Sequence, residues 1–373
     1  MKKSLIAIAA LAAVGAASAQ SSVTLYGLAD TGLQYTNSKV KVGDVTTKTS
    51  EFGANSGMLN GSRLGVKGAE DLGNGLKATF NYELGFNSAN GNFGTNGEAT
   101  SGFGRKATVG LAGNFGHVRI GRDNTVVDNL VTATSADAQS TVDTADRAYG
   151  RTTGRANDGT TDMVTDRANG VHYDGNFSGV AVSAFVAPSD ANGNGATFQK
   201  KTKVDGTTTF EERQLGYGLS VGYANGPLTA GVAAQQFTSK ESSAGVTTAK
   251  YSQTQAAVGG AYDFNVAKVY ANYIYNRDKN TVAGTTDKHN EANVGVTVPF
   301  GAASFVAEYG YNYDKPNNAE ALRSHDVTLG ANYAFSKRTD VYARAAYQGL
   351  LKASDSGISG NQQTYAVGLR HRF

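Results

Sequence analysis

The sequence contains no cysteine and no tryptophan among its 373 residues, and only 4 prolines. Without cysteine the chain can form neither a disulfide framework nor a thiolate metal site. Few prolines beside 47 glycines, 19 tyrosines and 16 phenylalanines favour strands joined by polar turns. No break in composition marks a domain boundary, and barrels run long as single units. We therefore expect one all-β domain.

Long hydrophobic runs are also missing. After residue 19 no run of about 18 apolar residues occurs, so the sequence offers no transmembrane helix. The apolar run Leu5–Val14 follows Lys2 and Lys3 and precedes Ala17-Ser18-Ala19, an order typical of a cleaved export signal. We expect residues 1–19 to be removed, so that the mature chain starts at Gln20. An N-terminal membrane anchor is the alternative, but this run is too short for one.

The charges show no excess of either sign, because 34 Lys and Arg stand against 31 Asp and Glu. Removing Lys2 and Lys3 with the signal lowers the formal net charge from +3 to +1. No run of lysine or arginine forms a basic stripe, which argues against a nucleic-acid partner. Any ion selectivity must therefore come from the arrangement of the charges.

Motifs of known catalytic sites are absent as well. The sequence has no G-x-S-x-G, H-E-x-x-H, Walker A or C-x-x-C motif, and its five histidines show no ligand spacing. The acidic residues Asp137, Asp143 and Asp146 lack the EF-hand register. We expect no enzymatic activity, no cofactor and no metal centre. A weak calcium or magnesium site on an outer loop remains an alternative. An outer-membrane enzyme is a second alternative, but no residue pattern in the sequence indicates a catalytic nucleophile with a nearby base.

What the sequence does contain is a period-2 alternation of apolar and polar residues. In Val23–Asp30, Val23, Leu25 and Ala29 share one face, while Thr24, Tyr26 and Asp30 share the other. A strand with this pattern has one apolar and one polar side. About sixteen such segments of ~10 residues follow one another. The clearest are Leu215–Tyr223, Ala256–Phe264, Val269–Tyr275, Val294–Phe300, Phe305–Tyr313, Val327–Phe335 and Val341–Tyr347.

Short turns alternate with longer polar connections along the chain. Asn225-Gly226-Pro227 and Asn265-Val266-Ala267 are short; polar loops are expected near 35–61, 87–102, 188–213, 238–253, 277–290, 314–324 and 352–361. This pattern is typical of a membrane β-barrel, in which closure pairs every strand edge. About sixteen strands leave an aqueous channel. A secreted β-sandwich or propeller also alternates, but it does not need tyrosine and phenylalanine at strand ends, where aromatic rings favour a membrane interface.

The longest stretch without alternation is Asp123–Asp166, between the strand-like segments His117–Arg122 and Gly170–Tyr173. It is rich in Asp, Thr, Ala and Arg and has no sustained period of 2 or 3.6. A connection of this length inside a compact domain is usually functional or disordered. In a barrel it could fold into the lumen as a constriction, and a disordered surface loop is the alternative.

Several stretches resemble the Gram-negative general porins of the β-proteobacterial type. They are Ser22–Gly27, Ser62–Gly73, Val109–Leu111, Asn114–Arg122 and Tyr365–Phe373. The resemblance implies a sixteen-stranded antiparallel transmembrane β-barrel over residues 20–373, multi-pass in the outer membrane, with its third loop folded into the pore. It also implies a homotrimer that passes ions and small hydrophilic solutes by diffusion and contacts outer-membrane lipid and lipopolysaccharide.

Eight charged residues near strand ends or in the long loop are candidates for the constriction. They are Arg63, Lys67, Arg105, Arg122, Arg167, Asp137, Asp143 and Asp146. In a narrow lumen, basic rings select anions and acidic rings select cations. The resemblance favours Arg63, Arg122 and Arg167 as wall residues, with Gly65 leaving room beside Arg63. With Asp143 opposing them from the loop, together with Asp146, we expect a weak anion preference. For any one arginine, a solvated loop charge is the alternative.

The final strand-like segment has its own pattern. Tyr365, Val367, Leu369, His371 and Phe373 share a face, and the sequence ends on an aromatic residue. A terminal phenylalanine in this setting resembles the recognition signal of the outer-membrane assembly machinery, although His371 replaces a more usual apolar residue. An ordinary strand end is the alternative.

Two other functions stay open for a barrel of this kind. A solute-selective channel would need an aromatic slide or a dense arginine cluster along the pore. A scaffold or adhesin would act through its outer loops with the lumen blocked.

Overall fold

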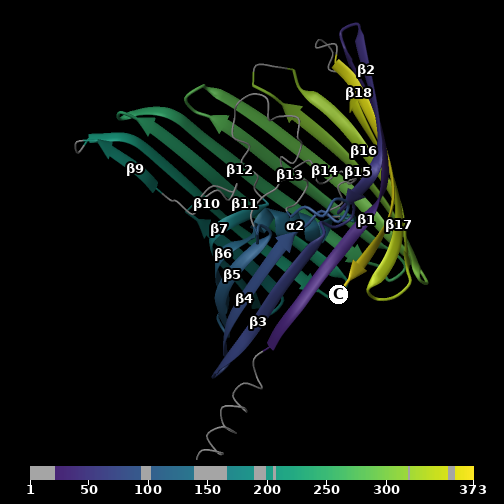
Figure 1. Cartoon of the computed structure of the whole chain (residues 1–373), viewed down its shortest axis with the longest axis horizontal. Coiled ribbons are helices and arrows are strands. Elements are labelled where there is room, and N and C mark those ends of the chain that lie inside the picture. Colours follow the sequence, from purple (N-terminus) through teal and green to yellow (C-terminus); the bar gives the residue numbers. More distant parts are fainter. Residues whose placement is uncertain are drawn as a thin grey trace, which may run out of the picture.

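The computed structural model describes residues 22–93, 102–137, 166–188, 199–204, 207–317, 320–351 and 358–373. The expected signal over residues 1–19 lies outside these ranges. The described residues form a closed antiparallel barrel with a short helix inside it (Figure 1). The elements are β1 (Ser22–Val42), β2 (Val45–Ser56), β3 (Arg63–Gly73), β4 (Leu76–Gly85), β5 (Lys106–Gly113), β6 (Gly116–Asn124), α2 (Val126–Thr134), β7 (Arg167–Phe177), β8 (Val180–Ala187), β9 (Gln199–Val204), β10 (Thr207–Asn225), β11 (Leu228–Ser243), β12 (Val246–Asp263), β13 (Lys268–Asn280), β14 (Thr285–Phe300), β15 (Ala303–Lys315), β16 (Leu322–Ala334), β17 (Thr339–Leu351) and β18 (Ile358–Arg372).

The labelled strands occupy sixteen positions in the wall. β2 and β3 both pair with β1, and β8 and β9 both pair with β10, so each couple forms one interrupted strand. β1 pairs with β18, from Leu28 opposite Arg372 onward, which closes the sheet. At this seam the backbones of Gly27 and Phe373 exchange two hydrogen bonds of 2.9 and 3.1 Å. The predicted sixteen-stranded antiparallel barrel is confirmed.

The barrel carries its apolar side chains on the outside. On β1, Val23 and Leu25 are 71% and 66% exposed, whereas Asp30 is fully buried. On β15, Phe305 and Tyr309 are exposed while Glu308 between them is buried. In a transmembrane barrel the outward band lies in lipid and the polar faces line the lumen. The alternation in the sequence therefore assigns the two faces correctly.

Several segments expected to be polar loops are instead paired strand. β1 and β2 continue as a ladder to a turn at residues 43–44, through most of the expected loop 35–61. β11 pairs with β12 out to Ser243 opposite Val246, and β13 pairs with β14 out to Asn280 opposite Thr285. Both faces of these hairpin extensions are polar, so the sequence shows no alternation of apolar and polar residues there. The backbone N–H and C=O groups of the paired strands still form hydrogen bonds with one another. Figure 1 shows them rising above one end of the barrel.

The helix α2 covers the first part of the expected pore loop. Its Val126, Val127 and Val131 are buried against Phe185 and other apolar side chains of the inner wall. Full burial of each valine contributes about 1.5–3 kcal/mol. The sequence analysis missed α2 because nine residues are too few for a helical period to stand out. Among the described helical residues, none belong to a helix long and apolar enough to cross a membrane.

Glycines on the inner wall allow this segment to approach closely. A Cβ added at Gly295 would lie 2.6 Å from the Cβ of Ala136, and one at Gly218 would lie 2.9 Å from Cγ2 of Val126. Real Cβ atoms do not come that close, so any side chain at these positions would push the segment away from the wall. The described part of the long loop, Thr125 to Asp137, is thus packed along the lumen side of β10–β15.

Candidate pore constriction

Three of the predicted basic residues come together at the ends of β3, β5 and β7. Arg63, Arg105 and Arg167 lie close enough for their like charges to act on one another. Arg105 and Arg167 are only 6% and 8% exposed. Glu83 of β4 lies among them, with its Oε1 2.7 Å from Nε of Arg105 and 3.9 Å from Nη1 of Arg63. Asp166 pairs with Arg167. The group therefore keeps one positive charge in excess.

The carboxylate of Glu83 is held in place by Tyr26 of β1. The Tyr26 hydroxyl lies 3.0 Å from Oε2 of Glu83 and 2.9 Å from Oδ1 of Asn81. Its ring fills the space over Gly65, so a Cβ there would collide with it. The room that the sequence analysis assigned to Arg63 is thus occupied by Tyr26. Arg63 instead donates from Nε to the carbonyl oxygen of Gly61 at 2.9 Å.

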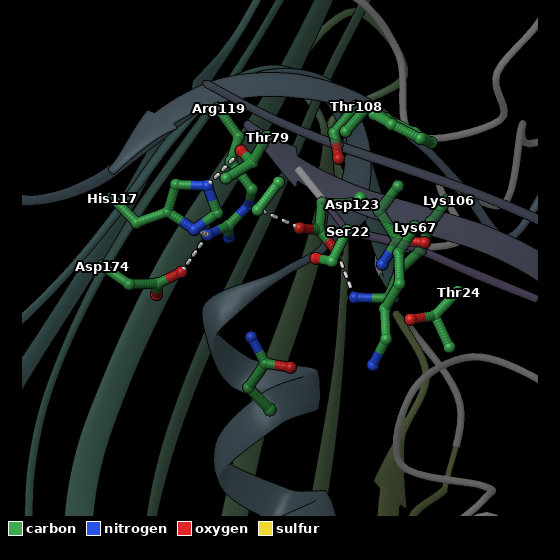
Figure 2. A pocket seen from close by; sticks show the side chains of 15 residues that line it. Ser22, Thr24, Lys67, Thr79, Lys106, Thr108, His117, Arg119, Asp123 and Asp174 are labelled. Carbon is green, nitrogen blue, oxygen red and sulfur yellow. Dashed lines mark hydrogen bonds and ion pairs between the residues drawn. The ribbon is translucent and has the colours of Figure 1, made fainter. Parts of the chain in front are cut away.

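Lys67 lies on the lumen side of β3, away from the arginine group. Its Nζ is 5.2 Å from the centroid of the Tyr26 ring. With Lys106, Arg119 and Asp123 it lines a cavity of about 540 Å³ beside α2 (Figure 2). Lys106 and Arg119 both bind Asp123, at 2.5 and 2.8 Å, and Arg119 also binds Asp174 at 2.5 Å, so of these three cations Lys67 is the one outside the ion pairs of the described residues.

Arg122 differs from the expectation. Along β6 it shares a face with Ile120, which is 60% exposed on the outward side, whereas Arg119 on the opposite face lines the cavity. Its Nε donates to the carbonyl oxygen of Gly104 at 2.6 Å and its Nη1 to Oδ1 of Asn169 at 3.1 Å. The structure therefore ties Arg122 to the residue before Arg105 and to β7.

The acidic residue Asp137 is tied to the wall. Nε and Nη2 of Arg344, on β17, each donate to its carboxylate at 2.7 Å. The backbone N–H groups of Ala136 and Asp137 donate to Oε2 of Glu308 at 2.9 and 3.2 Å. Because Arg344 and Glu308 are buried, these contacts fix the described end of the segment against β15 and β17. Asp143 and Asp146 lie outside the described residues.

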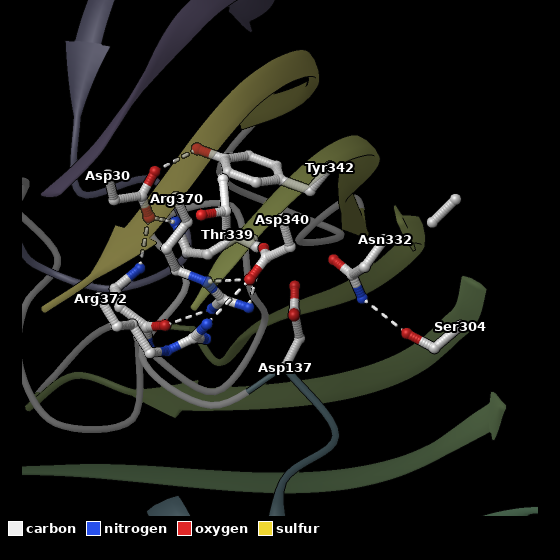
Figure 3. Close-up of polar contacts among 12 residues, drawn as sticks. Asp30, Asp137, Ser304, Asn332, Thr339, Asp340, Tyr342, Arg370 and Arg372 are labelled. Carbon is white, nitrogen blue, oxygen red and sulfur yellow. Dashed lines mark hydrogen bonds and ion pairs between the residues drawn. The ribbon is translucent and has the colours of Figure 1, made fainter. Parts of the chain in front are cut away.

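A second segment, residues 57–62 between β2 and β3, also folds inward, and Asp30 holds it. Oδ2 of Asp30 accepts from the backbone N–H groups of Leu59 and Asn60 at 2.8 Å each, and Oδ1 accepts from the Tyr342 hydroxyl (Figure 3). Met58 and Leu59 are buried against Tyr342. Arg63 follows this segment directly, so the hydrogen bonds to Asp30 also fix the position of Arg63, the first arginine of the group.

Sequence reasoning missed Glu83, Glu308, Arg344 and Asp30 as residues that shape the lumen. The available signal was a charged residue alternating with apolar neighbours on an inward face, as in Glu308 and Arg344. The partners themselves are distant in sequence. Within the described ranges no group of three or more histidine or carboxylate side chains is placed to hold a metal ion.

The comparisons with known proteins agree with this architecture. The family model for Gram-negative porins matches residues 5–350. Outer membrane porin protein 32 of Delftia acidovorans is 35% identical over 388 residues, with 100% of both chains covered. The solved anion-selective porin from Comamonas acidovorans is 28% identical, with a TM-score of 0.69 over 95% of this chain and 100% of that one. The trimer form of OmpT from Vibrio cholerae, at 17% identity, TM-score 0.60 and coverage of 95% and 99%, shows the fold alone. The chain therefore belongs to the Gram-negative porins, outer-membrane β-barrels that act as channels for passive diffusion.

Proposed function

We propose that this porin passes ions and small hydrophilic solutes with a weak preference for anions at low salt. The observation that carries the proposal is the group of Arg63, Arg105 and Arg167, whose charge exceeds that of Glu83 and Asp166 beside them. In a confined lumen such an excess raises the local anion concentration. The solved relative from Comamonas acidovorans is described as anion-selective, which supports the same sign here.

We infer that Asp123–Asp166 forms the constriction. The packing of Thr125 to Asp137 on the inner wall supports this inference. Asp143 and Asp146 would then oppose the arginines from the loop. The net preference would be a small difference between two larger electrostatic contributions, which is why we propose a weak one.

The working unit that we propose is a homotrimer in the outer membrane, with residues 1–19 removed after export. The trimer form of the Vibrio cholerae OmpT, which shares the fold, supports the assembly. A channel of this kind needs no catalytic turnover and no cofactor. Contact with the assembly machinery through Phe373 belongs to the same proposal.

The test is the zero-current potential of single channels in a salt gradient. An ion about 7 Å from a unit charge in water gains roughly 0.6 kcal/mol, so Arg63→Glu changes its energy by about 1 kcal/mol, or roughly fivefold in local concentration. Arg63→Glu should shift the potential toward cation preference, Arg63→Gln by about half as much, and Asp143→Asn toward anions. All shifts should shrink in 1 M salt, where screening acts over about 3 Å.

Lys337→Glu is the matched control, because Lys337 is exposed in the turn between β16 and β17 and undergoes the same change of charge. It should leave the potential unchanged. If neither Arg63→Glu nor Asp143→Asn moves the potential, these residues do not line the constriction. Channels with no measurable conductance would instead favour a scaffold or adhesin with a blocked lumen.

A further inference from the structure

Four buried polar atoms on the inward face of β13, β14 and β15 have no hydrogen-bond partner within the described part of the chain. They are Oδ1 of Asn276, Nε2 of His289, Oε2 of Glu291 and Oδ1 of Asn312. Each of these residues is at most 8% exposed, and Glu291 is fully buried. Buried polar atoms without a partner destabilise a fold and are rare in native proteins. Their concentration on three neighbouring strands points to a ligand.

The strand register places the four side chains next to one another. Asn276 lies directly opposite His289, and Glu291 lies directly opposite Asn312. His289 and Glu291 are two positions apart on β14, so they share its inward face. Side chains that lie directly opposite one another have Cβ atoms about 4.5–5.5 Å apart. The four atoms therefore belong to one patch of the inner wall.

The ring of His289 is oriented by Asp314 of β15. Its Nδ1 lies 2.6 Å from Oδ1 of Asp314, so in the neutral ring the carboxylate accepts the Nδ1–H and Nε2 keeps its lone pair. Nε2 lies 3.7 Å from Oε2 of Glu291, which is too far for a hydrogen bond. Two donors on a tetrahedral metal ion with bonds of about 2.0–2.1 Å are about 3.3 Å apart, so a shift of about 0.4 Å lets both atoms bind one ion. A carboxylate on the second ring nitrogen is the usual support of a metal-binding histidine.

The neighbouring groups add oxygen atoms and negative charge. Asn312 donates from Nδ2 to the carboxylate of Asp326 on β16, so Oδ1 is the end of its amide that is left to accept. The other oxygen of the Glu291 carboxylate, Oε1, accepts from a neighbouring amide at 2.6 Å. Among the described residues, the ion pairs of Glu291 involve only His289. Asp314 and Asp326 add two further carboxylates around that one histidine, so this part of the wall favours a cation.

We propose that His289, Glu291 and Asn312 form a binding site for a divalent transition-metal ion such as Zn²⁺. Nε2 of His289 and Oε2 of Glu291 are the main donors, Oδ1 of Asn312 is the third, and a water that donates to Oδ1 of Asn276 completes four-coordination. Imidazole nitrogen suits Zn²⁺, whereas Ca²⁺ and Mg²⁺ take oxygen ligands. Because the third protein donor is an amide oxygen, the site needs only two histidine or carboxylate ligands. It does not rest on the ion selectivity proposed above, so the two proposals fail independently.

The test is a calorimetric titration of the porin with Zn²⁺ in nonionic micelles, without an affinity tag and after treatment with a chelator. One zinc ion should bind per subunit, and an equal concentration of Ca²⁺ should not displace it. Asp314→Asn keeps every donor and removes only the support of the ring, so it should weaken zinc binding by about 10–100-fold. His289→Gln and Glu291→Gln each remove a donor and should weaken binding at least as much. Co²⁺ bound in place of zinc should give the visible absorption of a four-coordinate ion, which His289→Gln should abolish.

His117→Gln is the matched control, because His117 also lies on the lumen side but its ring nitrogens contact Thr79 at 2.8 Å and Arg119 at 3.1 Å. This variant should bind zinc as tightly as the unmodified porin. The absence of saturable zinc binding, unchanged affinity in His289→Gln, or an equal loss in His117→Gln would overturn the proposal. So would displacement of zinc by Ca²⁺, which would make the patch a site of oxygen ligands alone. Should His289→Gln fail to fold, Asp314→Asn decides in its place, and unchanged zinc affinity there would overturn the proposal as well.

Discussion

The ion pair between Asp137 and Arg344 predicts how firmly the segment after α2 is held to the wall. The Arg344 side chain is 1% exposed and that of Asp137 is 9% exposed. Removing one partner of a buried pair costs about 3–5 kcal/mol, because the other charge stays buried without compensation. Asp137→Asn should therefore lower the free energy of local opening at residues 135–137 by about 3 kcal/mol. The barrel ladder is untouched, so the melting of the barrel itself should change little.

Hydrogen exchange at the amides of Ala136 and Asp137 measures this opening directly. A loss of about 3 kcal/mol speeds exchange roughly a hundredfold. Glu308→Gln should have a smaller effect on exchange. It weakens the hydrogen bonds from the backbone N–H groups of Ala136 and Asp137, but it leaves the ion pair between Asp137 and Arg344 in place. Hydrogen bonds to a charged group contribute about 1.5–3 kcal/mol. Open-channel current noise should rise in the same order.

The double variant Asp137→Asn with Arg344→Gln decides whether the pair acts as a unit. It leaves no buried charge without a partner, so it should cost less than the sum of the two single variants. Additive effects would refute the reasoning. Unchanged exchange in Asp137→Asn would show that the segment is held by other contacts.

Two further predictions concern assembly. Deleting Phe373 should slow outer-membrane insertion in cells far more than it lowers the resistance of the inserted barrel to urea. The folded barrel loses two backbone hydrogen bonds to Gly27, each worth about 1 kcal/mol, and the contact of a 47% exposed ring stacked on His371. Insertion at the normal rate would contradict the role of this residue as a signal. The native mass in mild detergent should correspond to three subunits, and the mass of a single subunit would argue against the homotrimer.

The features that the sequence predicts well are those that depend on near neighbours in the chain. Period-2 alternation is local, so it assigned Asp30 to the polar face of β1 and identified the barrel. Where both faces of a strand are polar the signal disappears, as in the hairpin of β1 and β2 beyond Tyr35, although the ladder continues. The prediction therefore found the strands inside the membrane and mistook their extensions for loops.

The arrangement of the charges depends on contacts that no local pattern records. Arg344 and Asp137 are separated by 207 positions, and Glu83 meets Arg105 across a loop. Arg122 was expected in the lumen because of its position before the long loop, but along β6 it shares a face with Ile120, which is exposed on the outward side. Gly65 was taken to leave space because the sequence cannot show which ring fills it.

The seam between β1 and β18 joins the first described strand to the last residues of the chain. Until Phe373 is present, β1 has no partner for the Gly27 end of its edge, and the sheet keeps two open edges. Open edges pair readily with other chains. Contacts that span almost the whole sequence also form slowly, because the ends must first find one another. A chain still being made therefore cannot complete the barrel, and closure has to wait for the whole polypeptide.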